Sequence, residues 1–486
     1  MNPPDDDPVL RTGRPVEPDN ASGPVDAAPE PLTPPPTSPD STAPVVPGES
    51  VGHDAYAAFR FPAYRLYVVS FVLAIIGSQT LSAAAAFDVY EKTRSPLIVG
   101  LIGLANAIPL LTLAMPAGHI ADNYSRKRVL ILTQVFLVAC PLALAFWHTL
   151  TAIFALLVVN AVALTFGRPA RAAILPNLVP KALFPNAVTW NSSVFELASS
   201  IAPAATGLII ARHGAPAAYV VSGVAMGLCV VLTCFLPDVR ARPPGSAREP
   251  LNLQTLAAGL RFVGRNKLLL GPMLLDLLAV ILSGATALMP AFAERLAGDP
   301  TSPGFSDRKA VLYGWLMAAP SLGAIGMAVY QAHTPPVRRA GRVMLLAVIG
   351  YGLATAVFGL SNSFWLSFFM LMLTGVFDNL SVVIRHSLVQ LATPDAMRGR
   401  VSAVNQVFVI SSNELGKVES GVTAALFGPV ASVVGGGIAT VLVTLGVARA
   451  FPPLRRLGSL RDVRPTDGSS DAIAQPADSS SGQTRF

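Results

Sequence analysis

Residues 97–117 read LIVGLIGLANAIPLLTLAMPA and contain no charged side chain. A membrane-spanning helix needs about 20 apolar residues to cross the ~30 Å hydrocarbon core of a bilayer, and this run has that length. The whole chain is 52% hydrophobic and 13% charged, about half the charged fraction of an average soluble domain. We therefore expect an all-α membrane protein with twelve spans. They cover residues 67–87, 97–117, 129–149, 150–166, 187–210, 216–236, 268–291, 310–330, 343–360, 363–383, 402–426 and 430–450.

The chain repeats itself at an offset of 214 residues. The matched pairs are Gly100 and Gly314, Ala105 and Ala319, Arg128 and Arg342, Val129 and Val343, Arg171 and Arg385, Pro180 and Pro394, Asn191 and Asn405, and Gly207 and Gly421. The arginine, proline and asparagine pairs near the middle of each half keep one spacing across a loop and into the next helix. Six spans separate the copies, so we predict two six-helix bundles of the same orientation, with a substrate site between them near the bilayer midplane.

The remaining segments divide the chain into its parts. Residues 60–236 and 268–453 are the two predicted bundles, and residues 237–267 connect them. Leucines and a valine share one face of a helix in the later part of this linker, beside basic residues, so we expect an amphipathic helix on the inner membrane surface. Residues 1–55 are rich in Pro, Asp, Ser and Thr, and residues 459–486 are polar, so disorder is expected in both tails.

Basic residues gather on alternate loops. The richer loops hold Arg126, Lys127, Arg128, Arg168, Arg171, Lys181, Arg240, Arg242, Arg248, Arg261, Arg265, Lys267, Arg338, Arg339, Arg342, Arg385, Arg398 and Arg400. Only six basic residues, among them Lys92 and Arg94, lie on the other loops. The positive-inside rule then places both termini in the cytoplasm of a bacterial cell, with the bundles in its inner membrane. The net charge of +7 reflects this topology and does not indicate nucleic-acid binding.

Ionisable side chains inside spans are costly and usually face a bundle interior or a water-filled cavity. The eleventh predicted span carries Glu414, Lys417 and Glu419, so it cannot face lipid on all sides. Glu414 and Lys417 are spaced for a local ion pair, while Glu419 points to the opposite face. One interpretation is a structural pair plus a second carboxylate. The other is that one of the carboxylates takes up a proton as the cavity alternates between the two membrane faces.

Three other carboxylates lie within predicted spans. Glu196 and Asp276 have no partner close in sequence, so we predict that they bind protons or substrate, against the alternative of hydrogen-bonded contacts between helices. Asp378 is a further candidate that could instead pair with an arginine at the inner face. The third, sixth and ninth predicted spans contain no ionisable residue, and the twelfth has only Arg449 at its inner end. We expect these four helices to face lipid.

The loop between the second and third spans contains the segment AGHIADNYSRKRVL. Gly118 permits close approach of two helices, and Asp122 can accept hydrogen bonds from a neighbouring helix N-terminus. The run Arg126, Lys127 and Arg128 can contact phosphates or opposing carboxylates. Together these residues form a predicted conformational latch.

The spacing within this loop resembles the signature G-x-L-A-D-R-x-G-R-K of the major facilitator superfamily. Asn123 and Ser125 depart from it, where the family has Arg and Gly. The resemblance implies that Asp122 and its basic partners stabilise the outward-facing state. The resemblance extends from about residue 60 to residue 453. Residues 168–198, 273–294 and 393–430 look like the branch that contains the enterobactin exporter and related bacterial drug-efflux proteins.

This resemblance implies a proton-driven antiporter that exports a drug or a siderophore, and so a role in siderophore export or multidrug resistance. The antiporter signature of the fifth span is degenerate, since it reads Ala202, Pro203, Thr206 and Gly207. Lys417 is also unexpected in this branch and would favour an anionic substrate. We predict a monomeric exporter of amphipathic small molecules that works by rocking of the two bundles.

A different class of function is also open. A transporter-like membrane sensor or assembly partner could recruit another protein through its long acidic, Pro-rich amino-terminal tail. No nucleophile, acid–base pair or metal-ligand constellation is apparent, so we expect neither an enzyme nor a cofactor. Cys140, Cys229 and Cys234 lie in predicted spans and have no zinc spacing.

Overall fold

The computed structural model describes residues 56–237, 253–334, 337–460 and 463, and the side chains of residues 122, 181, 253–256 and 395–396 fall outside this description. The expected disordered tail over residues 1–55 and most of the tail from residue 459 lie outside the described residues. The first part of the linker does so as well.

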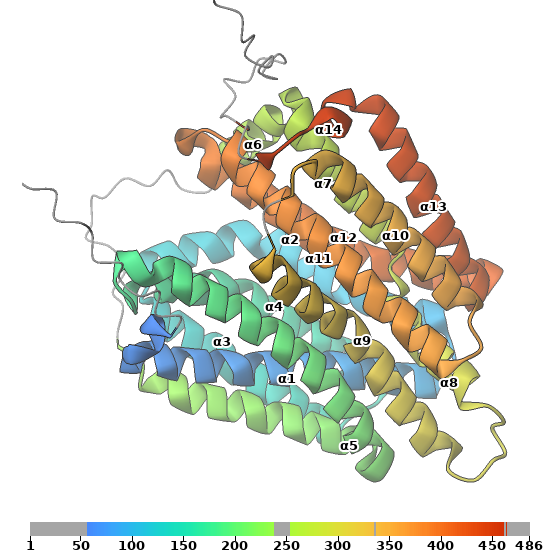
Figure 1. Ribbon diagram of the computed structural model, residues 1–486. Coiled ribbons are helices and arrows are strands. Elements are labelled where there is room, and N and C mark those ends of the chain that lie inside the picture. Colours follow the sequence, from blue (N-terminus) through green and yellow to red (C-terminus); the bar gives the residue numbers. More distant parts are fainter. Residues whose placement is uncertain (1–55, 238–252, 335–336, 461–462, 464–486) are drawn as a thin grey trace, which may run out of the picture. The chain divides into compact units, whose positions relative to one another are not determined.

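The described chain is helical. Its long helices are α1 (Pro62–Thr93), α2 (Pro96–Asn123), α3 (Arg126–Phe146), α4 (Leu150–Ile174), α5 (Phe184–Cys234), α6 (Leu253–Arg265), α7 (Lys267–Leu282), α8 (Met289–Ala297), α9 (Phe305–His333), α10 (Ala340–Leu360), α11 (Phe364–Ala392), α12 (Asp395–Phe427) and α13 (Pro429–Ala450). Short helical turns η1 (Ala57–Arg60), η2 (Leu175–Asn177), η3 (Lys181–Leu183), η4 (Ala285–Leu288) and α14 (Pro452–Arg456) complete the described elements. Figure 1 shows α1 to α5 gathered in one bundle and α7 to α13 in another.

The fifth and sixth predicted spans form the single 51-residue element α5, which bends at Gly214. The backbone of Gly214 has φ 78°, a left-handed conformation that glycine adopts without the steric penalty of a Cβ atom. Pro216 follows it and cannot donate a backbone hydrogen bond to the preceding turn. The bend therefore separates α5 into two consecutive crossing segments, at the boundary that the sequence predicts.

Ten helical segments in the described ranges are long and apolar enough to span a membrane, and the bent α5 is counted among them as one. Division of α5 at Gly214 adds an eleventh. The 33-residue α12 corresponds to the polar span predicted at residues 402–426 and is long enough to cross a bilayer. The all-α membrane fold is confirmed.

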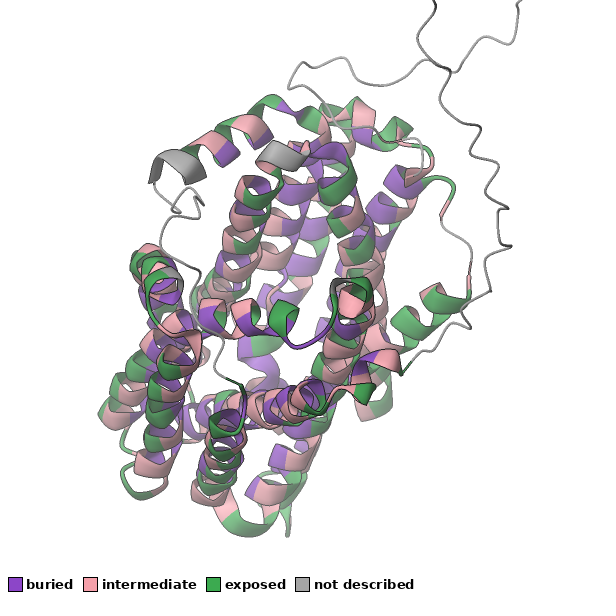
Figure 2. Ribbon diagram, turned by 90° about the vertical axis from the view of Figure 1, so that its left-hand side faces the viewer, coloured by how far each residue is buried: buried purple, intermediate pink, exposed green. Residues whose placement is uncertain are grey.

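Figure 2 shows buried and exposed residues alternating along the helices. The third, sixth, ninth and twelfth predicted spans expose large apolar side chains, as expected for lipid-facing segments. Examples are Phe136 on α3, Val224 in the second segment of α5, Leu353 on α10 and Leu442 on α13, which are 48 to 63% exposed. Water-soluble domains rarely expose so many large apolar side chains. Parts of these four helices therefore contribute to the outer surface of the two bundles.

The linker helix α6 packs against α12. Gly259 lies against the backbone carbonyl of Arg400, where a Cβ atom would approach within 2.9 Å. Val263 is fully buried and packs with Leu269 of α7, whereas Leu260 is half exposed. The predicted helix therefore forms, and its apolar face is partly used for contact with the carboxyl-terminal bundle.

The two bundles meet where glycines of the repeat face one another. Gly100 of α2 packs against Gly421 of α12, and Gly207 of α5 packs against Gly314 of α9. A Cβ atom at Gly100 would lie 2.9 Å from the Cα of Gly421, and one at Gly207 would lie 2.8 Å from the Cα of Gly314. The offset of 214 residues converts each contact into the other, so the seam has the pseudo-twofold symmetry that the repeat predicts. We call these four residues the glycine seam.

Charged residues close the same end of the bundles. We name this end, which contains the connection between α1 and α2 at Arg94, the loop-94 end; the opposite end, which contains Ser125, is the loop-125 end. Arg94 Nη1 donates to Glu294 Oε2 of α8 over 2.8 Å, and Lys309 of α9 pairs with Glu91 of α1. Figure 1 shows the bundles together near α8 and α9 and farther apart toward α6.

Candidate functional site

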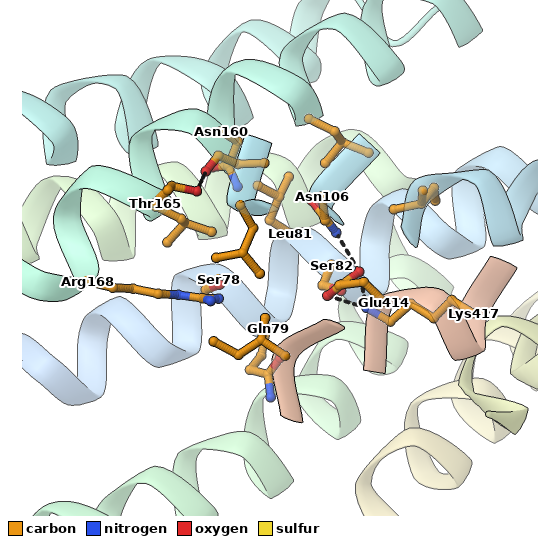
Figure 3. A pocket seen from close by; sticks show the side chains of 16 residues that line it. Ser78, Gln79, Leu81, Ser82, Asn106, Asn160, Thr165, Arg168, Glu414 and Lys417 are labelled. Atoms are coloured by element: carbon orange, nitrogen blue, oxygen red, sulfur yellow. Dashed lines mark hydrogen bonds and ion pairs between the residues drawn. The ribbon is translucent and has the colours of Figure 1, made fainter. Parts of the chain in front are cut away.

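A polar pocket, which we call pocket A, lies where the amino-terminal bundle meets α12 of the other bundle, and Figure 3 shows the side chains that line it. Helices α1, α2 and α4 form most of its wall, and α12 of the other bundle completes it. Its polar lining consists of Ser78, Gln79, Ser82, Asn106, Asn160, Thr165, Arg168, Glu414 and Lys417. Because one wall comes from the opposite bundle, rocking of the bundles would open and close this pocket.

A second pocket, pocket B, lies in the carboxyl-terminal bundle between α7, α9, α10 and α11. Its polar lining includes Asp378 and Asn379 of α11 and Tyr351 of α10. Here the contribution from the opposite bundle is Glu196 of α5. Pocket B thus also straddles the boundary between the two bundles.

The two pockets are copies of one another. Their linings correspond at the 214-residue offset in Asn106 and Pro320, Leu110 and Ala324, Leu157 and Leu371, Asn160 and Thr374, Ala161 and Gly375, Leu164 and Asp378, Thr165 and Asn379, Arg168 and Val382, and Ile410 and Glu196. The internal repeat therefore extends from the helices to the cavities. Only the side chains differ, so these differences show how each pocket has been specialised.

The specialisation is electrostatic. Pocket A holds two cations, Arg168 and Lys417, and one carboxylate, Glu414. Pocket B holds two carboxylates, Glu196 and Asp378, and no cation. Each carboxylate of pocket B is replaced by an apolar residue at the repeat-equivalent position of pocket A. Ile410 corresponds to Glu196, and Leu164 corresponds to Asp378. One cavity is therefore cationic and its copy is acidic.

Neither carboxylate of pocket B forms a hydrogen bond or an ion pair with a described residue. Asp378 interacts electrostatically with Asp276, Arg385 and Glu196. A carboxylate without a hydrogen-bonded counter-ion inside a membrane protein is costly, and uptake of a proton removes that cost. Each carboxylate of pocket B can therefore lower this cost by taking up a proton.

Comparison with known proteins agrees with this architecture. The model of the family described as transmembrane secretion effector matches residues 53–482. This chain belongs to that family. It is accordingly a multi-pass transporter of the major facilitator superfamily and not an enzyme, and the fold implied by the signature loop is confirmed.

Several relatives of similar sequence are enterobactin exporters. Those of Shigella boydii serotype 4 (strain Sb227) and Escherichia coli O81 (strain ED1a) are each 28% identical over 400 residues, which cover 81% of this chain and 93% of the relative. Among solved structures, the nucleoside transporter NupG aligns with a TM-score of 0.60 at 14% identity, over 81% of this chain and 99% of its own. A bacterial homologue of the human lysosomal transporter Spinster, in its inward-facing and unoccupied conformation, gives a TM-score of 0.60 at 15% identity, over 81% and 95% of the two chains.

Asp276 does not line either pocket. It forms an ion pair with Arg385, which is 2% exposed, and this pair joins α7 to α11. Removal of one partner would leave an uncompensated buried charge, which typically costs about 3–5 kcal/mol. The structure therefore favours the interpretation of Asp276 as a contact between helices. Its partner, Arg385, lies on another helix and is distant in the sequence.

The local pair predicted in α12 is present. Lys417 Nζ lies 3.0 Å from both carboxylate oxygens of Glu414, and Asn106 Nδ2 donates to Glu414 Oε2 over 3.3 Å. Lys417 is thus neutralised within its own helix. Glu419 accepts a hydrogen bond from the hydroxyl of Ser420 at 3.4 Å and lines neither pocket.

The predicted latch residues lie at the loop-125 end and make contacts within their own bundle. Arg126 Nη1 donates to the carbonyl of Ala173 over 3.0 Å, and Lys127 Nζ donates to the carbonyls of Cys234 and Leu236 over 2.7 and 2.6 Å. These bonds tie the start of α3 to the end of α4 and to the end of α5.

The other latch residues occupy helix ends. Gly118 is buried in α2, and the backbone N–H of Arg128 donates to the hydroxyl of Ser125, which caps α3. The side chain of Asp122 lies outside the described residues. The role of the latch in stabilising an outward-facing state stays a prediction.

The repeated prolines and asparagines have equivalent structural surroundings in the two bundles. Pro180 and Pro394 accept equivalent bonds from the N–H groups of Leu183 and Met397, each over 2.9 Å. The side-chain oxygens of Asn191 and Asn405 are both buried without a hydrogen-bond partner among the described residues. The turn and the following helix are therefore built alike in both bundles.

The two repeated arginines have diverged. The sequence places Arg171 and Arg385 on loops, but they lie within α4 and α11, because both helices continue beyond their apolar runs. Arg171 stacks over the ring of Phe71 at 5.7 Å, whereas Arg385 is paired with Asp276. Arg168 is the residue that sequence reasoning missed, since the predicted fourth span ended at residue 166 and left it on a loop.

Proposed function

We propose that this transporter is a proton-driven exporter of amphipathic small molecules that works as a monomer by alternating access in a bacterial inner membrane. Support for its direction comes from its relatives, which are named enterobactin exporters. The class of substrate that we propose is therefore siderophore-like or drug-like. Proton binding is assigned to Glu196 and Asp378 of pocket B.

The distribution of basic loops gives the proposed orientation. The loop-125 end carries Arg126, Lys127 and Arg128 and would face the cytoplasm by the positive-inside rule. The glycine seam and the Arg94–Glu294 pair would then close the outer side of the passage. In this orientation the bundles are in an inward-facing arrangement, ready to receive a substrate from the cytoplasm.

One observation carries the proposal. Two pockets related by the internal repeat lie at the boundary between the bundles, and the acidic one contains two carboxylates without a cation. Like charges in one cavity repel each other, so binding of a proton to either carboxylate relieves the repulsion. Glu196 lies on α5 of the opposite bundle, so its distance from Asp378 depends on the position of α5. Protonation of pocket B is thereby linked to the relative position of the two bundles.

Transport of enterobactin into everted membrane vesicles tests this proposal. Vesicles that contain the full chain and have an acidic lumen are expected to accumulate enterobactin at least about tenfold faster than vesicles without the protein. Addition of nigericin and valinomycin, which together collapse the proton gradient, should reduce accumulation to the level of the empty vesicles. Accumulation that persists after both ionophores would contradict proton coupling, and no accumulation at all would contradict transport of this cargo.

The alternative function as a sensor or assembly partner depends on residues 1–55, which lie outside the described residues. Deletion of this tail separates the two functions. The exporter proposal expects unchanged enterobactin accumulation by the truncated chain. Loss of a bound partner protein, together with no flux for either chain, would support the alternative.

A further inference from the structure

Pocket A contains one cation that no neighbouring group neutralises directly. Arg168 extends from α4 into the pocket, and its side chain is exposed to the cavity (Figure 3). It makes no hydrogen bond or ion pair with any described residue, although Glu414 acts on it electrostatically. The carboxylate of Glu414 is already engaged by Lys417 and Asn106. A cation inside a membrane cavity is costly without a counter-ion, and a bound anionic ligand would supply one.

The repeat indicates that this charge is not needed for the fold. The equivalent residue in pocket B is Val382, at the same place on α11 that Arg168 occupies on α4. An apolar side chain therefore occupies that position in the other bundle. The positive charge of Arg168 is therefore a feature of the pocket itself.

Neutral hydrogen-bond donors accompany the arginine. The amide side chains of Gln79 and Asn160 line the same pocket and form no hydrogen bond with a described residue. Each offers two N–H donors. Guanidinium and amide donors directed into one cavity are suited to oxyanions, since hydrogen bonds to an ionised acceptor are about twice as strong as neutral ones.

An apolar pocket begins beside the same arginine. Phe71, Leu137, Phe195 and Met226 line this third pocket together with Arg171, which stacks over the ring of Phe71. The pocket shares Ser78, Gln79, Leu164 and Arg168 with pocket A. A molecule bound here could place a charged group against Arg168 and an aromatic body against the apolar wall. Pockets of this mixed kind bind amphipathic ligands.

We propose that Arg168 binds an oxyanion of the transported molecule, such as a carboxylate, sulfonate or phenolate, with an attached aromatic body in the adjoining apolar pocket. Lys417 is not the anchor, because Glu414 neutralises it. The proposal rests on the proposed function, since it names the substrate class of that transporter. It also separates the tasks of the two copies, with the anion in pocket A and the proton in pocket B.

Two dyes that share a xanthene ring system test the proposal. Fluorescein is an anion at pH 7.5 and rhodamine 123 is a cation. Fluorescence polarisation would measure binding of each dye to the purified full chain in a neutral detergent. The wild-type protein is expected to bind fluorescein at least about tenfold more tightly than rhodamine 123. Arg168→Gln should weaken fluorescein binding at least about tenfold, as expected for loss of a charge-assisted contact.

Matched variants control for structural effects. Arg168→Lys keeps the charge and should retain part of the affinity for fluorescein. Arg449→Gln makes the same substitution at an exposed arginine of α13 that lines none of the three pockets, and it should leave both affinities within about twofold. Thermal unfolding of each variant would identify a change in folding. If Arg168→Gln is unfolded, the fluorescein affinity of Arg168→Lys decides whether a positive charge at this position binds the anion.

Several results would overturn the proposal. They are no binding of fluorescein by the wild-type protein, no preference for it over rhodamine 123, or equal weakening of both dyes by Arg168→Gln. Binding is measured without a gradient, so the result is independent of transport. If Arg168 binds fluorescein but the protein does not accumulate enterobactin, only the exporter proposal is contradicted. If the protein accumulates enterobactin but Arg168 does not bind fluorescein, only the anion site is contradicted.

Discussion

Gly100→Leu should reduce enterobactin accumulation in vesicles at least about tenfold without preventing insertion into the membrane. A Cβ atom at this position would already approach the carbonyl oxygen of Lys417 to 2.7 Å and the Cα of Gly421 to 2.9 Å. Those atoms belong to the backbone and cannot move aside as a flexible side chain could. The leucine would hold the bundles apart at the loop-94 end, so one of the two states of the transport cycle could not form.

The repeat supplies an independent copy of this test. Gly207→Leu at the symmetric contact with Gly314 should have the same effect, because a Cβ atom there would lie 2.8 Å from the Cα of Gly314. Gly227→Leu and Gly446→Leu are the matched controls, since no atom lies within 4 Å of a Cβ built at either residue. Transport at the wild-type rate by both seam variants would show that close approach of the glycines is not part of the cycle.

Glu196→Gln and Asp378→Asn should each lower gradient-driven accumulation at least about tenfold, and the double variant should abolish it. Both substitutions remove a group that can gain and lose a proton while they preserve its approximate shape. Exchange of labelled for unlabelled enterobactin across vesicles needs no net proton movement, so it should continue in both variants. Measurement of net accumulation and exchange on the same vesicles would separate proton coupling from substrate binding.

Glu419→Gln is the control for these variants. Glu419 is a partly buried carboxylate of α12, but it lines neither pocket. Its replacement should leave net accumulation within about twofold of the wild-type rate. Equal loss of accumulation and exchange in Glu196→Gln or Asp378→Asn would instead assign these residues to the binding of substrate or to folding.

The spans were largely predictable from the sequence, because each must place enough apolar residues in the hydrocarbon core. The last predicted span, residues 430–450, corresponds to α13 (Pro429–Ala450). Helix ends were less predictable, since a helix can continue past the apolar run into the headgroup region. The fourth span shows this difference: the apolar run ends at residue 166, whereas α4 continues to Ile174. Arg168 was therefore placed on a loop rather than in a cavity.

Contacts between distant residues could not be read from the repeat alone. Self-similarity showed that Gly100 and Gly314 are equivalent, but Gly100 packs against Gly421 and Gly314 packs against Gly207, so neither touches its own copy. Asp276 likewise pairs with Arg385 on another helix, which no local spacing reveals. A repeat defines which positions correspond, while the packing of the bundles defines which of them touch.

We propose that the two bundles rock about the glycine seam, so that the ends of the passage open in turn. Spin labels at repeat-equivalent residues can follow both ends by double electron–electron resonance, in a chain whose cysteines are replaced by serine. Thr149 and Ser363 report on the loop-94 end, and Asn177 and Leu391 report on the loop-125 end; all four are exposed. When Glu196→Gln and Asp378→Asn are combined to imitate protonation, rocking of the bundles should lengthen one distance and shorten the other. Distances that change in the same direction, or that stay fixed while the wild-type chain transports, would contradict it.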